Sequence, residues 1–272
     1  MPSSDQPYLF LDTETATLRG APHLLELAAV RVVDGEVQDT FSSLVAPAVA
    51  IDPEASAYHG IVDNDVRAAP LTAEVLTDFT GWAQEDPIVA HDARSDLHVL
   101  SFEYARHDLS PPTCAVFDTL PMARRAFPDA PDHRLGTLVE MLEFDVEAEH
   151  RALPDAVACW QLFEACLAGL DDEEQAALLE RGSLTLDLAS AMPRLPRRKP
   201  SIVRTLERAR TRGDNVRITY GTDQAAMARI EVAPRLIYQA RERAYLEGEC
   251  QRSGELKTYR LDRIHRVEDA RT

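Results

Sequence analysis

Lysine and cysteine are scarce in this chain, and it has no apolar run of membrane-spanning length. Only two of its 272 residues are lysine, so arginine carries nearly all of the positive charge. The four cysteines are scattered, without the paired spacing of a zinc site or a disulfide framework. Charge interrupts every apolar run well before the roughly 20 residues of a membrane helix, and no basic-then-apolar leader is present. The composition predicts a soluble cytoplasmic protein with reduced thiols and no membrane partner.

Positive and negative charge are unevenly distributed along the chain, whose net charge is −17. Residues 1–180 hold 9 Lys and Arg against 34 Asp and Glu, a net charge of −25, whereas residues 181–272 hold 20 against 12, a net charge of +8. One explanation is an acidic surface that favours solubility beside an arginine content that reflects base composition. The other explanation is functional: the basic C-terminal part binds a negatively charged partner, next to an acidic N-terminal part.

The pattern of apolar segments predicts an α/β domain over residues 1–185, a linker over 186–200 and a small β-rich domain over 201–272. In the first domain, strand-like and helix-like segments alternate, and an antiparallel pair follows the first strand. The linker holds three prolines and a basic cluster, which prevent a long helix or strand. An amphipathic helix and several short strands are expected beyond it.

Two acids end the first apolar run, YLFLDTET. Residues two apart on a strand face the same side, so the carboxylates of Asp12 and Glu14 lie together. Adjacent acids repel, and one would be protonated near neutral pH unless a cation compensates. Hard oxygen donors with no Cys or His nearby favour Mg²⁺ or Mn²⁺ over zinc. Taken alone, such a motif is more often a strand end where two acids reach solvent.

Two later segments add carboxylates where a strand or loop meets a helix. VAHDARSDLHVL places Asp96 about one helical turn after a strand end, and EHRALPDAVACW places His150 five residues before Asp155. Pro154 suits the first turn of a helix that carries Asp155, which leaves His150 on the preceding loop. Strand-to-helix crossings line the ligand crevice of an α/β sheet, so these groups are expected to converge there.

The three motifs resemble those of the DEDDh family of 3′-to-5′ exonucleases, the group of the proofreading subunit of bacterial DNA polymerase III. The family's D-x-E-T, H-N-A-x-F-D and H-x-x-x-x-D motifs are matched by DTET, HDARSD and HRALPD. The resemblance covers roughly residues 8–170 and implies a ribonuclease H-like mixed sheet flanked by helices. It also implies that His150 is the general base and that two divalent ions, Mg²⁺ or Mn²⁺, are held by Asp12, Glu14, Asp96 and Asp155.

The same resemblance implies which residues contact the substrate: Thr13, Thr15, Leu18, His59, His91 and Asp92. For His59, a role in packing its own loop is the alternative. Arg124, Arg125 and Arg151 are either phosphate contacts or solvated helix surface.

Two departures from the family motifs bear on the substrate. In the second motif Asp92 replaces the usual Asn and Ser95 the usual Phe, and TATLRG replaces the T-T-G-L that follows the first motif. Neither departure removes a metal ligand or the base. Substrate preference, more than activity, is therefore expected to differ.

The C-terminal segment resembles the WYL domain, a small β-barrel module of the Sm/SH3 type. The match runs from VRITYG to KTYRLDRIHRVE, with the signature tripeptide kept in part as Ala-Tyr-Leu. Tyrosines interleaved with arginines suit single-stranded nucleic acid, and the alternative is that the tyrosines fill the core. The resemblance implies that nucleic acid or a negatively charged regulatory ligand is bound by Tyr245, Lys257, Arg260 and Arg263.

The leading hypothesis is a metal-dependent 3′-to-5′ exonuclease that degrades single-stranded DNA ends to nucleoside 5′-monophosphates. The first alternative is an exoribonuclease that processes RNA 3′ ends, because selection between DNA and RNA depends on contacts to the 2′-hydroxyl. The second is a non-catalytic, ligand-responsive regulator that binds nucleic acid. The sequence leaves the oligomeric state, the pathway and the ligand of the WYL-like domain open.

Overall fold

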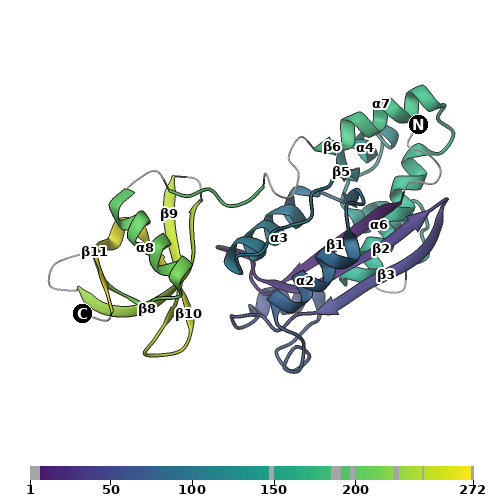
Figure 1. Cartoon of the computed structure of the whole chain (residues 1–272). Coiled ribbons are helices and arrows are strands. Elements are labelled where there is room, and N and C mark those ends of the chain that lie inside the picture. Colours follow the sequence, from purple (N-terminus) through teal and green to yellow (C-terminus); the bar gives the residue numbers. More distant parts are fainter. Residues whose placement is uncertain are drawn as a thin grey trace. The chain divides into compact units, whose positions relative to one another are not determined.

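The computed structural model describes residues 7–146, 150–184, 191–196, 200–222, 227–240 and 242–270 (Figure 1). The chain forms two compact units, with the boundary between Met192 and Pro193 and with Ala105–Asp108 grouped with the second unit. Of the predicted linker, residues 186–190 and 197–199 lie outside the described part.

A six-stranded mixed sheet forms the centre of the first unit. Its order is β3-β2-β1-β4-β5-β6, so the strand that carries YLFLDTET lies in the interior. β1 pairs antiparallel with β2 and parallel with β4. β2 and β3 pair antiparallel with each other, which confirms the antiparallel pair predicted after the first strand. The strands are β1 (Tyr8–Thr15), β2 (Leu24–Val33), β3 (Glu36–Leu44), β4 (Ile88–Ala90), β5 (Val116–Asp118) and β6 (Ser183–Leu184).

Helices cover both faces of this sheet (Figure 1). The alternation of side chains along β1 sends Leu9 and Leu11 into the core formed with α2 and α3, and Phe10 into the core formed with α4, α6 and α7. Asp12 and Glu14 share the parity of Phe10 and therefore face the α6 side. The helices are α1 (Pro53–His59), α2 (Thr72–Ala83), α3 (Arg94–Arg106), α4 (Thr119–Ala126), α5 (Leu135–Met141), α6 (Ala152–Leu167) and α7 (Asp172–Gly182).

In the part of the second unit that the structure describes, an α-helix and a short 3-10 helix accompany a five-stranded antiparallel sheet of order β10-β9-β8-β7-β11. The apolar face of the helix, with Val203 and Leu206, packs into a core with Val216 and Ile218 of the sheet. This confirms a β-rich domain that opens with an amphipathic helix. The elements are α8 (Pro200–Arg212), β7 (Val216–Tyr220), β8 (Ala228–Ala240), β9 (Arg243–Cys250), β10 (Leu256–Arg260), the 3-10 helix η2 (Leu261–Arg263) and β11 (Ile264–Asp269).

Within the described residues, no helix combines the length and the apolar character that crossing a bilayer requires.

Candidate active site

Three carboxylates converge beside the C-terminal end of β1. Asp12 and Glu14 come from this strand and Asp155 from the first turn of α6, and each contributes an oxygen atom within 4.8 Å of the other two. The convergence follows from the fold, because α6 covers the sheet face toward which both strand residues point. The structure thus brings together three of the four residues that the sequence nominated as metal ligands.

The fourth nominated ligand, Asp96, approaches from the other direction. It lies in the first turn of α3, and its Oδ1 accepts a hydrogen bond of 2.7 Å from the Thr13 hydroxyl. Asp96 is not in the group of three, yet after burial its charge is the largest cause of the raised pKa of Asp12. The Thr13 side chain therefore ties α3 to β1 next to the acidic cluster.

Burial and mutual repulsion raise the pKa values of these acids. The pKa of Asp12 lies well above its usual range, first through burial and then through the charges of Asp96 and Asp155. Burial, followed by Asp155 and Glu26, raises the pKa of Glu14 to about 8, and burial raises that of Asp96 to about 7. A cation among these groups would relieve the repulsion. The all-oxygen donor set fits a hard divalent ion such as Mg²⁺ or Mn²⁺.

His150 lies next to this cluster. It precedes α6 with a left-handed φ of 60°, and its ring centroid is 4.0 Å from that of Tyr58. Both rings line a cleft of about 930 Å³ that also includes Asp12 and Asp155. An imidazole and two acids thus open onto one volume that can admit a substrate.

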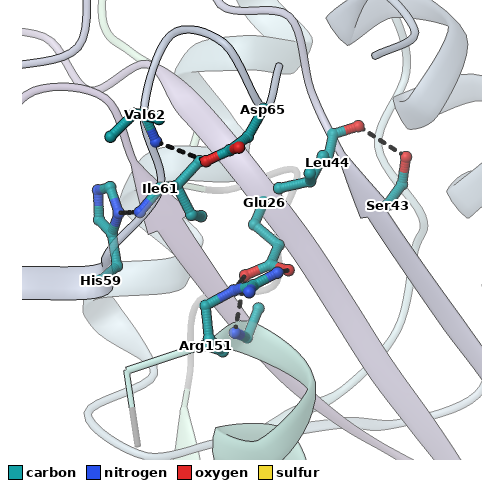
Figure 2. A network of polar contacts seen from close by, with 9 residues as sticks. Glu26, Ser43, Leu44, His59, Ile61, Val62, Asp65 and Arg151 are labelled. Atoms are coloured by element: carbon teal, nitrogen blue, oxygen red, sulfur yellow. Dashed lines mark hydrogen bonds and ion pairs between the residues drawn. The ribbon is translucent and has the colours of Figure 1, made fainter. Parts of the chain in front are cut away.

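The start of α6 is anchored to the sheet by Glu26, a buried residue of β2 that is paired across the sheet with Glu14 (Figure 2). The Glu26 carboxylate accepts hydrogen bonds from Arg151 Nε at 3.0 Å and Nη2 at 2.7 Å, and from the backbone N–H of Ala152 at 3.1 Å. Three donors satisfy this buried charge. Because His150 directly precedes Arg151, the same contacts hold the backbone of the histidine near the cleft.

Glu26 was not identified from the sequence, and Arg151 was considered only as a phosphate contact or solvated surface. The structure gives Arg151 an internal partner instead. The sequence signal for Glu26 is that it is the single acid inside the apolar run LLELAAV. If that strand is buried, the carboxylate needs a cationic or hydrogen-bonding partner.

His59 is buried, and its ring contacts the following loop and the end of β1; Figure 2 shows the first of these contacts, with Ile61. Its Nε2 lies 3.3 Å from the carbonyl oxygen of Thr15, and its Nδ1 accepts a hydrogen bond of 3.0 Å from the N–H of Ile61. Burial lowers the pKa of His59. These contacts tie α1 to the end of β1, as the packing alternative describes.

His91 and Asp92 line the cleft after β4. His91 Nδ1 lies 2.9 Å from the Thr119 hydroxyl and Nε2 2.8 Å from the carbonyl oxygen of His133, so its ring joins α4 to the loop before α5. Asp92 is exposed at a φ of 55°, and its N–H donates to Asp118 Oδ1 at 3.0 Å. The carboxylate of Asp92 therefore faces the solvent of the cleft.

Thr15 is the last residue of β1, and Leu18 lies in the segment that follows it. The Thr15 hydroxyl donates to the carbonyl oxygen of Thr17 at 3.1 Å, and the N–H of Leu18 donates to Asp52 Oδ2 at 3.2 Å. The side chain of Leu18 is 52% exposed, which leaves an apolar group available at the surface.

The residues nominated in the second unit have neighbours of their own. Lys257 pairs with Glu255 at 2.9 Å and Arg260 with Asp262 at 2.6 Å, whereas Arg263 is partly buried just before β11. Tyr245 stacks on Tyr238, with ring centroids 5.3 Å apart and planes at 22°.

Burial divides the tyrosines of this unit. Tyr238 and Tyr259 are buried, as the core alternative describes, while Tyr220 and Tyr245 are partly exposed.

Two family models match the chain. Residues 9–163 match the model described as Exonuclease, and residues 201–269 match the model of the WYL domain. The first match spans the acidic cluster and His150, and the second spans α8 and the antiparallel sheet.

Among curated proteins, similar relatives are DNA polymerases III of the PolC type. The protein of Oceanobacillus iheyensis is 34% identical over 177 residues, which cover 65% of this chain and 12% of that protein. The protein of Bacillus subtilis is 31% identical over 156 residues, which cover 57% of this chain and 11% of that protein. The chain therefore corresponds to a small part of the length of these relatives.

Among solved structures, E. coli exonuclease I in complex with a dA16 oligonucleotide has a TM-score of 0.54 at 15% identity, covering 90% of this chain and 55% of that one. The nuclease domain of 3′hExo, a DEDDh family member bound to rAMP, has a TM-score of 0.53 at 17% identity, covering 61% and 92%. These likenesses show a shared fold.

The Glu26 anchor predicts that Arg151→Ala reduces stability as well as activity. Loss of the guanidinium leaves a buried carboxylate short of two donors, so the free energy of unfolding should fall by about 2 kcal/mol in urea titrations. Arg151→Lys should recover only part of this loss, because an ammonium cannot form the bidentate pair. The exposed Arg181→Ala on α7 is the matched control. Unchanged stability with a salt-dependent rise in KM would instead identify Arg151 as a phosphate contact.

The raised pKa values predict an unusual pH dependence of the metal-free protein. Glu14 and Asp96 have pKa values of about 8 and 7 in the folded state, above those of free carboxyls, so their stabilising contribution is lost as the pH rises through these values. In EDTA the Tm should fall by roughly 5 °C between pH 6 and pH 9, at about 2–4 °C per kcal/mol. Saturating Mn²⁺ should abolish the fall.

Glu14→Gln serves as the control for this pH dependence. It removes one of the repelling acids, so the metal-free variant should be more stable than wild type at pH 8 and gain less from Mn²⁺. A flat Tm profile of the metal-free wild type would contradict the prediction.

Proposed function

Because the chain belongs to the exonuclease family, we propose that it hydrolyses nucleic acid stepwise from single-stranded 3′ ends and releases nucleoside 5′-monophosphates. The convergence of Asp12, Glu14 and Asp155 carries this proposal, because two of these acids, Asp12 and Asp155, line the same cleft as His150. An acidic cluster with raised pKa values is well suited to bind cations and poorly suited to bind a phosphate directly.

Four residues, Asp12, Glu14, Asp96 and Asp155, would hold two divalent metal ions. When bound, such ions lower the pKa of water and stabilise the charge on the phosphoryl oxygens. The acids contribute by being fixed before the substrate arrives: two on a rigid strand, one at the start of α6 and one held by Thr13. Little reorganisation is then needed at the moment of reaction.

His150 would accept the proton of the attacking water. The imidazole is the side chain whose ordinary pKa is closest to neutral, and a general base works best when its pKa is near the working pH. The anchored Arg151 keeps the His150 backbone near Asp155, so the base remains on the side of the cleft where the acids lie.

The terminal nucleotide would be bound by the residues around the end of β1 and by the cleft wall. We assign the apolar side chain of Leu18 to the terminal base and the backbone of Thr13 to its ribose. Thr15 and His59 would hold the backbone at the end of β1 in place by hydrogen bonds, without touching the nucleotide. Beyond the acids, His91 and Asp92 line the path of the strand, and Arg124 and Arg134, which also line the cleft, would contact its phosphates.

DNA is the favoured substrate because similar curated relatives are DNA polymerases III of the PolC type. An RNA 3′ end is the alternative, supported by the rAMP bound to the nuclease domain of 3′hExo. The extra charge of Asp92 would disfavour a nearby phosphate, so it bears on substrate preference more than on the chemistry.

The WYL domain would deliver nucleic acid or sense a negatively charged ligand. Its net positive charge supports this role, and Tyr245, Lys257, Arg260 and Arg263 are the proposed contacts. The sheet would close into the small barrel of its family, joined to a nuclease domain of residues 1–185 by the linker 186–200. We also propose a cytoplasmic location, where both domains would meet nucleic acid.

Digestion of 5′-labelled single-stranded DNA tests the nuclease proposal. With Mg²⁺ or Mn²⁺ the full chain should produce a ladder that shortens from the 3′ end, and Asp12→Ala should lower kcat about a thousandfold, or about 4 kcal/mol in activation free energy. The exposed Glu36→Ala removes an acid from β3 and serves as the matched control.

RNA of the same base sequence, digested in parallel, should shorten more slowly than DNA. Faster RNA cleavage would favour the exoribonuclease alternative. An Asp12→Ala variant as fast as wild type would overturn the nuclease proposal. Binding without any cleavage would favour the regulator.

Charge reversal in the WYL domain tests the delivery role. Arg263→Glu should raise KM for long single-stranded DNA about three- to tenfold and reduce the salt dependence of binding, while kcat on a short oligonucleotide stays unchanged. Arg229→Glu makes the same charge change at an exposed position of β8. Equal effects of both variants would show a general charge effect rather than a specific contact.

A further inference from the structure

Two aromatic rings that line the cleft, those of Tyr58 and His150, are in contact. Their ring centroids are 4.0 Å apart and their planes are inclined by 35°, so the two rings lie against each other in a close, tilted contact. Tyr58 lies on α1 and His150 just before α6, so the contact joins two elements that are distant in the sequence.

Tyr58 is not a core residue. Its side chain is 60% exposed, although tyrosine is large enough to contribute much buried area when it packs in a core. The neighbouring His59, in contrast, is buried. Within α1, one aromatic residue therefore fixes the helix to the domain and the next presents its ring to the cleft.

The backbone beneath Tyr58 is held firmly. His59 contacts the carbonyl oxygen of Thr15 and the N–H of Ile61, while the N–H of Asp52, before α1, donates to the carbonyl oxygen of Ala16 at 2.8 Å. Figure 2 shows His59 and Ile61 near the anchored Arg151. Through these contacts α1 is attached to the end of β1, the strand that carries Asp12 and Glu14.

His150 needs such support. It lies on a loop with a φ of 60°, a conformation that residues with a side chain seldom adopt. The Glu26–Arg151 contacts hold the backbone beside the histidine and do not involve its ring. A ring stacked against the imidazole restricts the χ angles of the histidine.

We propose that Tyr58 is a positioning residue that holds the His150 imidazole toward the acidic cluster by stacking on it. This inference rests on the proposed function, in which His150 is the general base. The Tyr58 ring acts through the histidine and takes no part in the chemistry. The rival role, stacking on a base of the substrate, would act on binding.

A double-mutant cycle on the full chain separates the two roles. With single-stranded DNA and Mn²⁺, Tyr58→Ala should lower kcat about three- to tenfold, the effect of losing one aromatic pair, and leave KM within about twofold. Tyr58→Phe keeps the ring and should restore kcat. In a His150→Ala background, measured under single turnover at high enzyme concentration, Tyr58→Ala should have no further effect.

Leu71→Ala is the matched control, because Leu71 is a large side chain of similar exposure, 62%, at the start of α2. The inference is overturned if the loss from Tyr58→Ala persists in the His150→Ala background, if it falls on KM, or if Tyr58→Phe is as impaired as Tyr58→Ala. Persistence would assign Tyr58 to the substrate base.

A spectroscopic arm tests the contact independently of activity. In protein labelled at histidine, the ring protons of His150, assigned by their loss in His150→Gln, should be shifted upfield by the Tyr58 ring current. The shift should disappear in Tyr58→Leu and remain in Tyr58→Phe. Identical His150 shifts in wild type and Tyr58→Leu overturn the inference. If the wild type is inactive but shows the shift, the nuclease proposal is overturned while the contact between Tyr58 and His150 is confirmed.

Discussion

Repulsion among buried and partly buried carboxylates beside the end of β1 is the constraint around which the first unit is built. Asp12, Glu14 and Asp155 each place an oxygen within 4.8 Å of the others, and their mutual charge is costly where water is limited. Burial of apolar side chains elsewhere along the same strand offsets this cost, because Leu9, Phe10 and Leu11 are almost wholly buried. The resulting site favours binding of a cation. A bound metal ion can in turn stabilise negative charge on phosphoryl oxygens, which suits the site to phosphodiester hydrolysis.

A second set of contacts arranges what surrounds the acids. Glu26 is a further buried acid, and Arg151 compensates its charge. Its hydrogen bonds to Arg151 and to the N–H of Ala152 hold the start of α6 in place. Thr13 ties Asp96 to the strand from the opposite face. The arrangement of the acidic cluster thus depends on ordinary hydrogen bonds between elements, each satisfying a group that would otherwise be costly to bury.

The sequence predicted more about the site than about its supports. The alternation of strands and helices, the antiparallel pair after the first strand and the amphipathic helix at the start of the second unit follow from local patterns, and the structure confirms them. Arg151 and His59 are different cases, because a cation or an imidazole beside a motif has the same local pattern whether it faces substrate or a protein partner. Tyr58 had no signal at all, since its exposure is set by where α1 lies on the domain.

What the sequence determined by itself is the chemistry available to this protein: which acids alternate onto one face of a strand, which histidine precedes the last of them, and where the charge changes sign. These properties depend on residue types a few positions apart. Tertiary structure alone decided that Glu26 binds Arg151, that Thr13 reaches Asp96, and that Tyr58 lies on His150. Each of these contacts joins residues far apart in the chain, and only the packing of helices on the two faces of the sheet brings these residues into contact.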